Sequence, residues 1–422
     1  MHRFSGWSLQ HFSEAVVIEP PSEARHARVA VATLFFANGA LFASCVPRYP
    51  EMKNSIGLSN AAFGAAIAGY ALGALLVGLI AGFLVSRWGS SPVALVSFGA
   101  AAVNLALVGL APTWAALAAA LFVAGACDTV ADVANNTHSL RVEALYKRSI
   151  LNSLHGLWSI GAVVGAITSG AAAGLRLPLV LHFAIVGSVL LTMVGIAYRF
   201  LLPGGDTVER PPQHDAGDHS SSPDGQTVGR AVQRWRSRTV WTVLALGMLA
   251  ATAQVMEDAG STWSAIYLSG ELGATAFVAS LGFGALQASQ TVGRLLADRL
   301  VDRFGDRDVA RYGAALGGLT MFGALAVPMP LTTVIAFGLV GLGIGTLIPA
   351  GMRAANAAPG LSPGVGLAMA GTVLRVSGLV AAPVVGSVAD AAGLRVGLAA
   401  IPVAALVAVI LAGGLPGKVA RR

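Results

Sequence analysis

Charged side chains are scarce in this chain. Only 11% of its 422 residues are Asp, Glu, Lys or Arg, and 55% are hydrophobic. A soluble globular domain usually carries about 25% charged residues. The deficit excludes an ordinary soluble enzyme.

The sequence also lacks the usual marks of catalysis and cofactor binding. Its two cysteines, Cys45 and Cys127, lie inside apolar stretches, so neither a disulfide framework nor a metal site is indicated. It contains no nucleotide-binding loop, metal-ligand cluster or nucleophile elbow. The first 27 residues have no apolar core of signal-peptide length. We therefore expect no catalytic residues, no cofactor, no bound metal and no ATP-driven pumping.

What the chain has instead is a series of long apolar runs. A helix needs roughly 20 apolar residues to cross about 30 Å of hydrocarbon. Hydropathy, read together with Gly, Pro and charged residues as breaks, predicts an all-α membrane protein with twelve spans. These lie near 28–48, 61–85, 92–111, 113–137, 152–175, 177–200, 239–268, 274–297, 311–329, 331–353, 363–390 and 396–415.

A polar segment over 203–238 separates the sixth and seventh spans. Its acidic, Pro, Ser and Arg residues cannot bury a core, so we expect a flexible cytoplasmic linker between two bundles. The predicted organisation is a tail over 1–27, a six-helix bundle over 28–202, the linker, a second six-helix bundle over 239–415 and a basic tail over 416–422.

The basic residues predict the orientation, because Lys and Arg are retained in cytoplasmic loops. With the N-terminus inside, most basic loops, the linker and the C-terminal tail fall inside, whereas only Arg48, Lys53, Arg176 and Arg395 fall outside. We expect a multi-pass protein of the cytoplasmic (inner) membrane with both termini in the cytoplasm. The net charge of +7 then requires no nucleic-acid partner.

The two halves of the chain resemble each other. The sequence Arg-Trp-Gly at 87–89, after the second span, corresponds to Arg-Phe-Gly at 303–305, after the eighth. Gly161 in the fifth span corresponds to Gly378 in the eleventh at nearly the same offset. These landmarks imply a tandem duplication of six spans. Transporters built from parallel repeats place their substrate site between the halves near the middle of the membrane.

Both loops resemble the loop signature of the major facilitator superfamily, G-x-x-x-D-R-x-G. The match is strong over 293–305, and over 82–89 it has Ser where the acid is usual. The resemblance implies two pseudo-symmetric six-helix bundles. An Asp/Arg cluster beside a helix N-terminus can latch the cytoplasmic ends of the bundles through charge-assisted hydrogen bonds; the alternative is a solvated basic loop. The candidate gating residues are Arg87, Asp298, Asp302 and Arg303.

Three further segments, 132–136, 154–161 and 257–268, resemble the branch that includes fucose-permease-like sugar:proton symporters and uncharacterised inner-membrane relatives. In those permeases an acid in the fourth span, followed four residues later by Asn, helps couple protons to sugar, and Asp132 with Asn136 matches that pattern. Their second functional acid lies in the first span, where this chain has Ala43. The resemblance therefore specifies the fold more closely than the substrate.

Ionisable residues inside the spans are candidate sites, because burying a charge at the bilayer centre costs about 2.5–3.5 kcal/mol. We select Asp132, His155 and Glu257 as candidates for proton coupling. The alternatives are interfacial solvation or pairing with Arg141 for Asp132, a packing role for His155, and outer-leaflet hydrogen bonding for Glu257.

Arg375 lies about 18 Å into the eleventh span by helix rise. Because arginine stays protonated, it requires a buried acid or an anionic substrate as its partner; a structural salt bridge is the alternative. The other candidates for the substrate cavity are Asn38, Asn136, Trp158, Gln254, Trp263 and Gln287.

These residues favour proton-coupled movement of a small, sugar-like or otherwise polar solute by alternating access, with the solute, protons and the lipid bilayer as partners. We expect the protein to act as a monomer. Two alternatives stay open: a proton-driven exporter of drugs or amphipathic metabolites, and a transporter-like membrane sensor without turnover.

Overall fold

The computed structural model describes residues 21–146, 150–204, 227–361 and 364–417, and the regular secondary structure in these parts is entirely helical. The N-terminal bundle begins with α1 (Ser22–Cys45), the short 3-10 helix η1 (Val46–Arg48) and α2 (Tyr49–Ile56), which together form its first span. The other five spans are α3 (Asn60–Trp88), α4 (Ser90–Leu110), α5 (Trp114–Tyr146), α6 (Leu151–Gly174) and α7 (Leu179–Tyr198).

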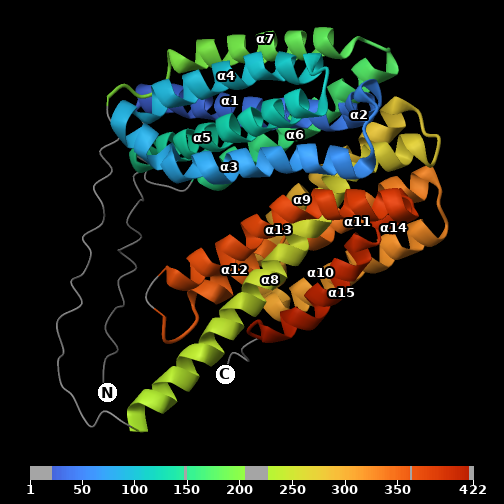
Figure 1. Ribbon diagram of the computed structural model, residues 1–422. Helices are drawn as coiled ribbons and strands as arrows, with labels where there is room; N and C mark the ends of the chain where they lie inside the picture. The colour runs from blue at the N-terminus through green and yellow to red at the C-terminus, as the bar shows by residue number, and fades with distance from the viewer. Residues whose placement is uncertain (1–20, 147–149, 205–226, 362–363, 418–422) are drawn as a thin grey trace, which may run out of the picture.

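The C-terminal bundle repeats this arrangement. It consists of α8 (Thr227–Gly270), α9 (Ala276–Phe304), α10 (Asp306–Ala326), α11 (Pro330–Ile344) continued by α12 (Leu347–Asn356), α13 (Val365–Ala392), and α14 (Leu394–Gly397) continued by α15 (Ala400–Leu411), with η2 (Ala412–Gly414) at its end. The predicted fold of two six-helix bundles is confirmed (Figure 1).

Ten of the helical segments are long and apolar enough to cross a membrane by length and composition. The remaining two predicted spans, the eighth and ninth, correspond to α9 and α10. These two helices carry the charged sequence 298–311 between them, which lowers their hydropathy. In α9 the uncharged stretch 276–293 also contains two Gln and several Ser and Gly residues, so polar and small residues as well as charged ones keep these two helices below the hydropathy of the other spans.

The predicted linker differs from the structure at its C-terminal end. Residues 205–226 lie outside the described part of the chain, but the backbone of 227–238 is already helical and belongs to α8. Sequence composition missed this extension, because its Arg and polar residues indicate solvent exposure without excluding a helix. Most of the two predicted tails, residues 1–20 and 418–422, lies outside the described part of the chain. Within the tail predicted over 1–27, α1 already begins at Ser22.

The loop glycines support the tandem repeat. Gly89 and Gly305 both have φ +87°, with ψ 151° and 156°. This backbone conformation is favourable only for glycine, and each of the two residues ends one helix and precedes the next. Corresponding positions of the two halves therefore make the same turn.

The two bundles contact each other at one end only. We call the end where α1 begins and α15 ends the terminal face, and the end carrying α2 and α14 the opposite face. The halves meet along α3 against α13 and along α6 against α9. The closest approaches, Gly64 to Ala382 and Gly170 to Ser280, all lie toward the opposite face. Figure 1 shows the bundles diverging toward the end where α8 begins, so this conformation opens at the terminal face.

A carboxylate from α13 caps α3 across this contact. Asp390 accepts hydrogen bonds from the backbone N–H groups of Asn60 and Ala61, both at 2.8 Å, and the Ser59 hydroxyl accepts from Ala62 N at 3.2 Å. The first N–H groups of a helix have no partner within the helix, and they attract negative charge. Asp390 therefore joins the two halves at the opposite face.

We expect Asp390→Asn to weaken this closure, because the amide carries no charge and is a poorer acceptor. Two charge-assisted hydrogen bonds at an exposed carboxylate contribute about 1 kcal/mol, which corresponds to a roughly fivefold change in the population of the closed face. A cysteine placed at Ala71, in a background lacking Cys45 and Cys127, should then react faster with a maleimide applied to the opposite face. An unchanged rate would show that Asp390 does not hold this face closed.

Candidate functional site

A central cavity lies between the two bundles. α1, α3, α5 and α6 of the N-terminal half and α8, α9 and α13 of the C-terminal half supply its walls. Its lining residues are Phe42, Val46, Tyr49, Ile67, Tyr70, Ala71, Asp128, Trp158, Gln254, Glu257, Asp258, Ser261, Thr262, Gln287, Gly378 and Ala382.

The N-terminal half places a hydrogen-bonded chain on this cavity. Trp158 Nε1 donates to Asn38 Oδ1 at 2.7 Å, and Asn38 Nδ2 donates to Asp128 Oδ1 at 3.1 Å. The Tyr70 hydroxyl also donates to the Asp128 carboxyl. Three helices thus orient one carboxyl through neutral partners.

Close backbone contact holds this chain in place. A Cβ atom on Gly39 would lie 2.0 Å from Trp158 O, and one on Gly161 would lie 2.1 Å from Phe36 O. Glycines at both positions let α1 and α6 approach until their backbones touch, as small residues do between membrane helices. Asn38 and Trp158 sit beside this crossing, so the helix packing sets the length of their hydrogen bond.

The C-terminal half contributes two adjacent carboxyls from α8. Gln290 Nε2 donates to Glu257 Oε2 at 2.7 Å, and Gln254 Nε2 donates to Asp258 Oδ1 at 2.9 Å. Asp258 lies against Gly378 of α13, where an added Cβ would be 3.3 Å from Oδ2. Gly378 therefore leaves room for the carboxyl, and both acids bind neutral amides.

Gln287 is a further acceptor on the same wall. Its side chain is 4% exposed, and its Oε1 atom has no hydrogen-bond partner among the described residues. An unsatisfied buried polar atom is costly, so a donor supplied by a ligand would stabilise it.

Aromatic side chains close the cavity toward the opposite face. Phe42 stacks on Trp158 with ring centroids 6.3 Å apart and reaches Phe283 of the other half at the same distance. Phe63 contacts the edge of Trp263 across the halves at 6.1 Å. These rings separate the carboxyls from the opposite face in this conformation.

Asp132, Asn136 and His155 lie outside the cavity lining. Asn136 Nδ2 donates to Asp132 Oδ1 at 2.9 Å, and Asp132 is exposed one turn beyond Asp128. His155 is exposed and packs edge-on against Phe35 at 5.1 Å. Asp132 shares a helix face with Asp128, and His155 shares one with Trp158. Both proton-coupling candidates lie nearer the terminal face than these cavity residues.

Trp263 and Arg375 also differ from the expected placement. Trp263 is fully buried and does not line the cavity. Arg375 is exposed on the same face of α13 as Gly378 and Ala382, and it makes no ion pair with any described residue. The salt bridge that was the alternative for Arg375 is therefore not formed among the described residues, and Arg375, predicted to face the substrate cavity, does not line it in this conformation. The other predicted cavity residues, Asn38, Trp158, Gln254 and Gln287, surround or line the cavity.

The predicted gating residues Arg87, Asp298, Asp302 and Arg303 are all exposed. None of them forms an ion pair within the described ranges. Their halves are separated at the terminal face, so a latch between them is not engaged here.

Sequence reasoning gave less weight to Asp128, Asp258, Tyr70 and Gln290 than the structure does. Asp258 was not among the predicted cavity residues, whereas it lines the cavity. Tyr70, which comes from the second span, α3, was not among the predicted cavity residues either. Its position among Ala and Gly residues gave no periodic signal.

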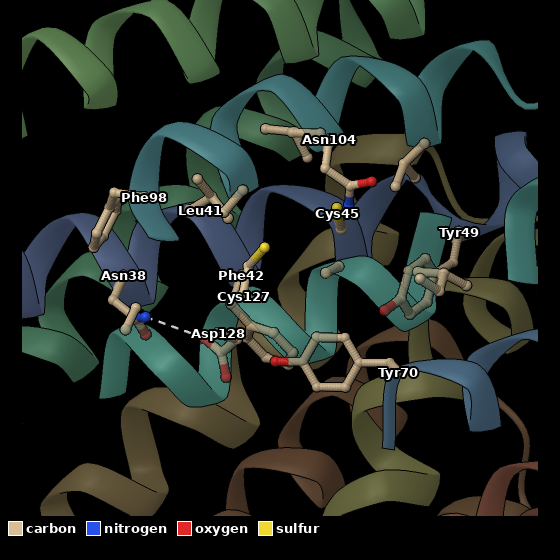
Figure 2. A pocket seen from close by; sticks show the side chains of 16 residues that line it. Asn38, Leu41, Phe42, Cys45, Tyr49, Tyr70, Phe98, Asn104, Cys127 and Asp128 are labelled. Carbon is tan, nitrogen blue, oxygen red and sulfur yellow. Dashed lines mark hydrogen bonds between the residues drawn. The ribbon is translucent and has the colours of Figure 1, made fainter. Parts of the chain in front are cut away.

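A side chamber opens from the cavity into the N-terminal bundle (Figure 2). It shares Phe42, Tyr49, Tyr70 and Asp128 with the central cavity. The other lining residues are mostly apolar: Asn38, Leu41, Cys45, Phe98, Ala101, Asn104, Leu105, Val108, Leu121, Ala124, Cys127 and Ala131.

Comparisons with known proteins agree with this architecture. A family model described as Major Facilitator Superfamily matches residues 31–257. The chain is 31% identical over 390 residues to an uncharacterized transporter, y4wD, of Sinorhizobium fredii, an alignment that covers 90% of this chain and 97% of the relative.

Among solved structures, a mutant of the nucleoside transporter NupG superposes with a TM-score of 0.72 and 15% identity, covering 92% of this chain and 98% of that one. FucP in an outward conformation superposes with a TM-score of 0.57 and 17% identity, covering 93% and 99%. At these identities the likeness shows the fold alone. The fucose-permease-like branch stays a prediction.

Proposed function

This chain belongs to the major facilitator superfamily of secondary transporters, and from that premise we propose that it couples the movement of a small solute to protons. The family consists of multi-pass membrane transporters and not of enzymes. The proton as coupling ion is our inference from the cavity.

The observation that carries the proposal is the set of three carboxyls, Asp128, Glu257 and Asp258, on both walls of one cavity. Their hydrogen-bond partners are neutral, and the described residues that line the cavity include no basic side chain. Like charges repel strongly where water is excluded, and ionised groups are costly within a membrane. Binding of protons or of a cation relieves both the repulsion and the cost of burying charge. The binding of a solute at this site therefore depends on whether the carboxyls are protonated.

Asp132 and His155 extend this site toward the terminal face. Asp132 lies one turn from Asp128, and His155 lies three residues before Trp158, so each shares the cavity-facing side of its helix. Both are exposed in the open half of the interface. We assign them to the path by which protons reach the three carboxyls.

We further propose that the terminal face is cytoplasmic. The loops there carry a dense cluster of basic residues over 299–311 and Arg353, whereas the opposite face carries few. Basic loops are retained in the cytoplasm. The conformation described is then open to the cytoplasm, and transport requires a second conformation in which the opposite face opens.

The test is solute-dependent proton flux. Proteoliposomes containing a pH-sensitive dye are mixed with solutes selected from sugars, organic acids and drugs by thermal stabilisation of the purified protein. We expect at least one solute to change the internal pH, with acidification indicating symport and alkalinisation indicating exchange. Net uptake of labelled solute without any pH change would remove the proton from the account, and binding without exchange would indicate a sensor.

A further inference from the structure

We propose that the transported solute is an organic ammonium ion that binds Asp128 and inserts its apolar group into the side chamber of the N-terminal bundle. The inference rests on the proposed transport function and names its substrate class. It follows from the position of Asp128, which lines both the central cavity and the side chamber.

The side chamber suits an apolar group. Leu41, Phe98, Leu105, Val108 and Leu121 supply most of its walls. The amide nitrogen of Asn104 already donates to Ala120 O at 2.9 Å. Asn38, Asp128 and the Tyr70 hydroxyl lie together on one side of the chamber, as Figure 2 shows, and the Tyr49 hydroxyl is a further polar group of the lining. This side is the mouth, because Tyr70 and Asp128 also line the central cavity. A small number of polar groups at the edge of an apolar pocket fixes the orientation of a ligand.

The mouth suits a positive charge. Asp128 is one of three carboxyls on the central cavity, and no basic residue is among the described residues that line either space. Phe42 and Tyr70, whose rings lie 5.9 Å apart, border both. Aromatic faces attract ammonium groups, most strongly where water is excluded. Gln287 Oε1, buried and without a partner among the described atoms, offers a further acceptor across the central cavity.

The rival is an anionic solute bound by Arg294 and Arg375. Both arginines are exposed, and neither forms an ion pair with a described residue. They lie closer to the terminal face than Gln290 and Gly378 on the same helices, and neither lines the cavity or the chamber. The enclosed cavity is lined by the carboxyls and not by these two arginines, so the geometry favours a cationic solute over an anionic one.

Three probes with one aromatic ring and one attached carbon separate these possibilities: benzylamine, benzyl alcohol and benzoate. At neutral pH they carry positive, zero and negative charge. We expect benzylamine to raise the melting temperature of the purified, detergent-solubilised protein, and the other two to leave it unchanged. Stabilisation by benzoate or benzyl alcohol instead, or by none of the three, would overturn the inference.

Asp128→Asn keeps the size of the side chain and removes its charge, so we expect it to weaken benzylamine binding about tenfold or more. Asp308→Asn is the matched control, because Asp308 is exposed at the start of α10, far from the lining residues. Equal weakening in both variants, or in neither, contradicts a site at Asp128.

A second variant tests the chamber without altering a charge. Ala124→Phe places a ring into the chamber, so benzylamine should bind about tenfold more weakly while Asp128 is retained. Size-exclusion chromatography confirms that each variant is folded. A folded Ala124→Phe protein that binds benzylamine as the wild type does would place the apolar group elsewhere.

The native cysteines provide a direct readout, because Cys45 and Cys127 both line the chamber. In a Cys45→Ala protein, benzylamine should slow alkylation of Cys127 by N-ethylmaleimide, measured by mass spectrometry, and benzoate should not. Equal rates with and without benzylamine would show that the chamber stays empty.

The outcomes also separate this inference from the proposed function. Benzylamine binding at Asp128 without proton flux in proteoliposomes would contradict proton coupling and leave the ammonium site standing. Proton flux driven by an anionic or neutral solute, with no benzylamine binding, would contradict the ammonium site and leave proton coupling standing.

Discussion

Glu257→Gln is expected to abolish proton-driven accumulation of solute while sparing exchange. In the wild type, Gln290 Nε2 lies 2.7 Å from the Glu257 carboxyl oxygen. The substituted amide fills the same space and can still accept this hydrogen bond, but it cannot bind a proton. With one proton per solute, a gradient of one pH unit sustains about tenfold accumulation. We expect that ratio to fall to about one in the variant, because no proton then drives the solute.

The measurement uses labelled solute in proteoliposomes with and without an imposed pH gradient, and counterflow as the assay of exchange. Asp308→Asn is again the control, since it removes an acid outside the cavity. Accumulation that persists in Glu257→Gln would transfer the coupling role to Asp128 or Asp258. Loss of exchange together with accumulation would show that Glu257 binds solute or supports the fold.

Gly161→Leu is expected to destabilise the protein by about 3 kcal/mol or more. Its Cβ would lie 2.1 Å from Phe36 O and 3.1 Å from Ala40 N. Both obstacles are backbone atoms, so α1 and α6 must separate to admit the side chain. That movement also breaks the packing beside Asn38 and Trp158.

The matched control lies on the same helix. A Cβ on Gly156 would meet no atom within 4 Å, so Gly156→Leu should leave the melting temperature nearly unchanged. Thermal unfolding followed by size-exclusion chromatography measures both variants. Equal stability of Gly161→Leu and wild type would mean that α1 and α6 do not touch as described.

Much of the fold could be predicted from the sequence, because lipid imposes a simple rule on it. Apolar runs of the length of a membrane had to be helices, and the repeated Arg-x-Gly loops marked the two halves. Gly89 and Gly305 adopt the same positive φ, which explains why glycine occurs at both positions. The helical backbone over 227–238 was missed because polar composition does not distinguish an exposed helix from a linker.

The site was harder to predict. A helical pattern assigns residues to one face of a helix, but it does not show at which depth along that face the two bundles enclose a cavity. Asp128 and Asp132 share one face, and the fucose-permease-like pattern favoured Asp132 over Asp128. The preference for Asp128 follows from Asn38 and Tyr70, which contact Asp128 from other helices. Arg375 was expected to pair with a buried acid or an anionic substrate, yet the open terminal face leaves it exposed.

The central claim is that one cavity serves both sides of the membrane because the bundles rock about it. Pulsed EPR distances test this directly, with spin labels at Ser86 and Leu367 on the terminal face and, in a second protein, at Ser55 and Val396 on the opposite face. We predict that a change between about pH 5 and about pH 8 shortens one distance and lengthens the other. Two distances that stay fixed, or that change in the same direction, in a protein that accumulates solute would contradict the account.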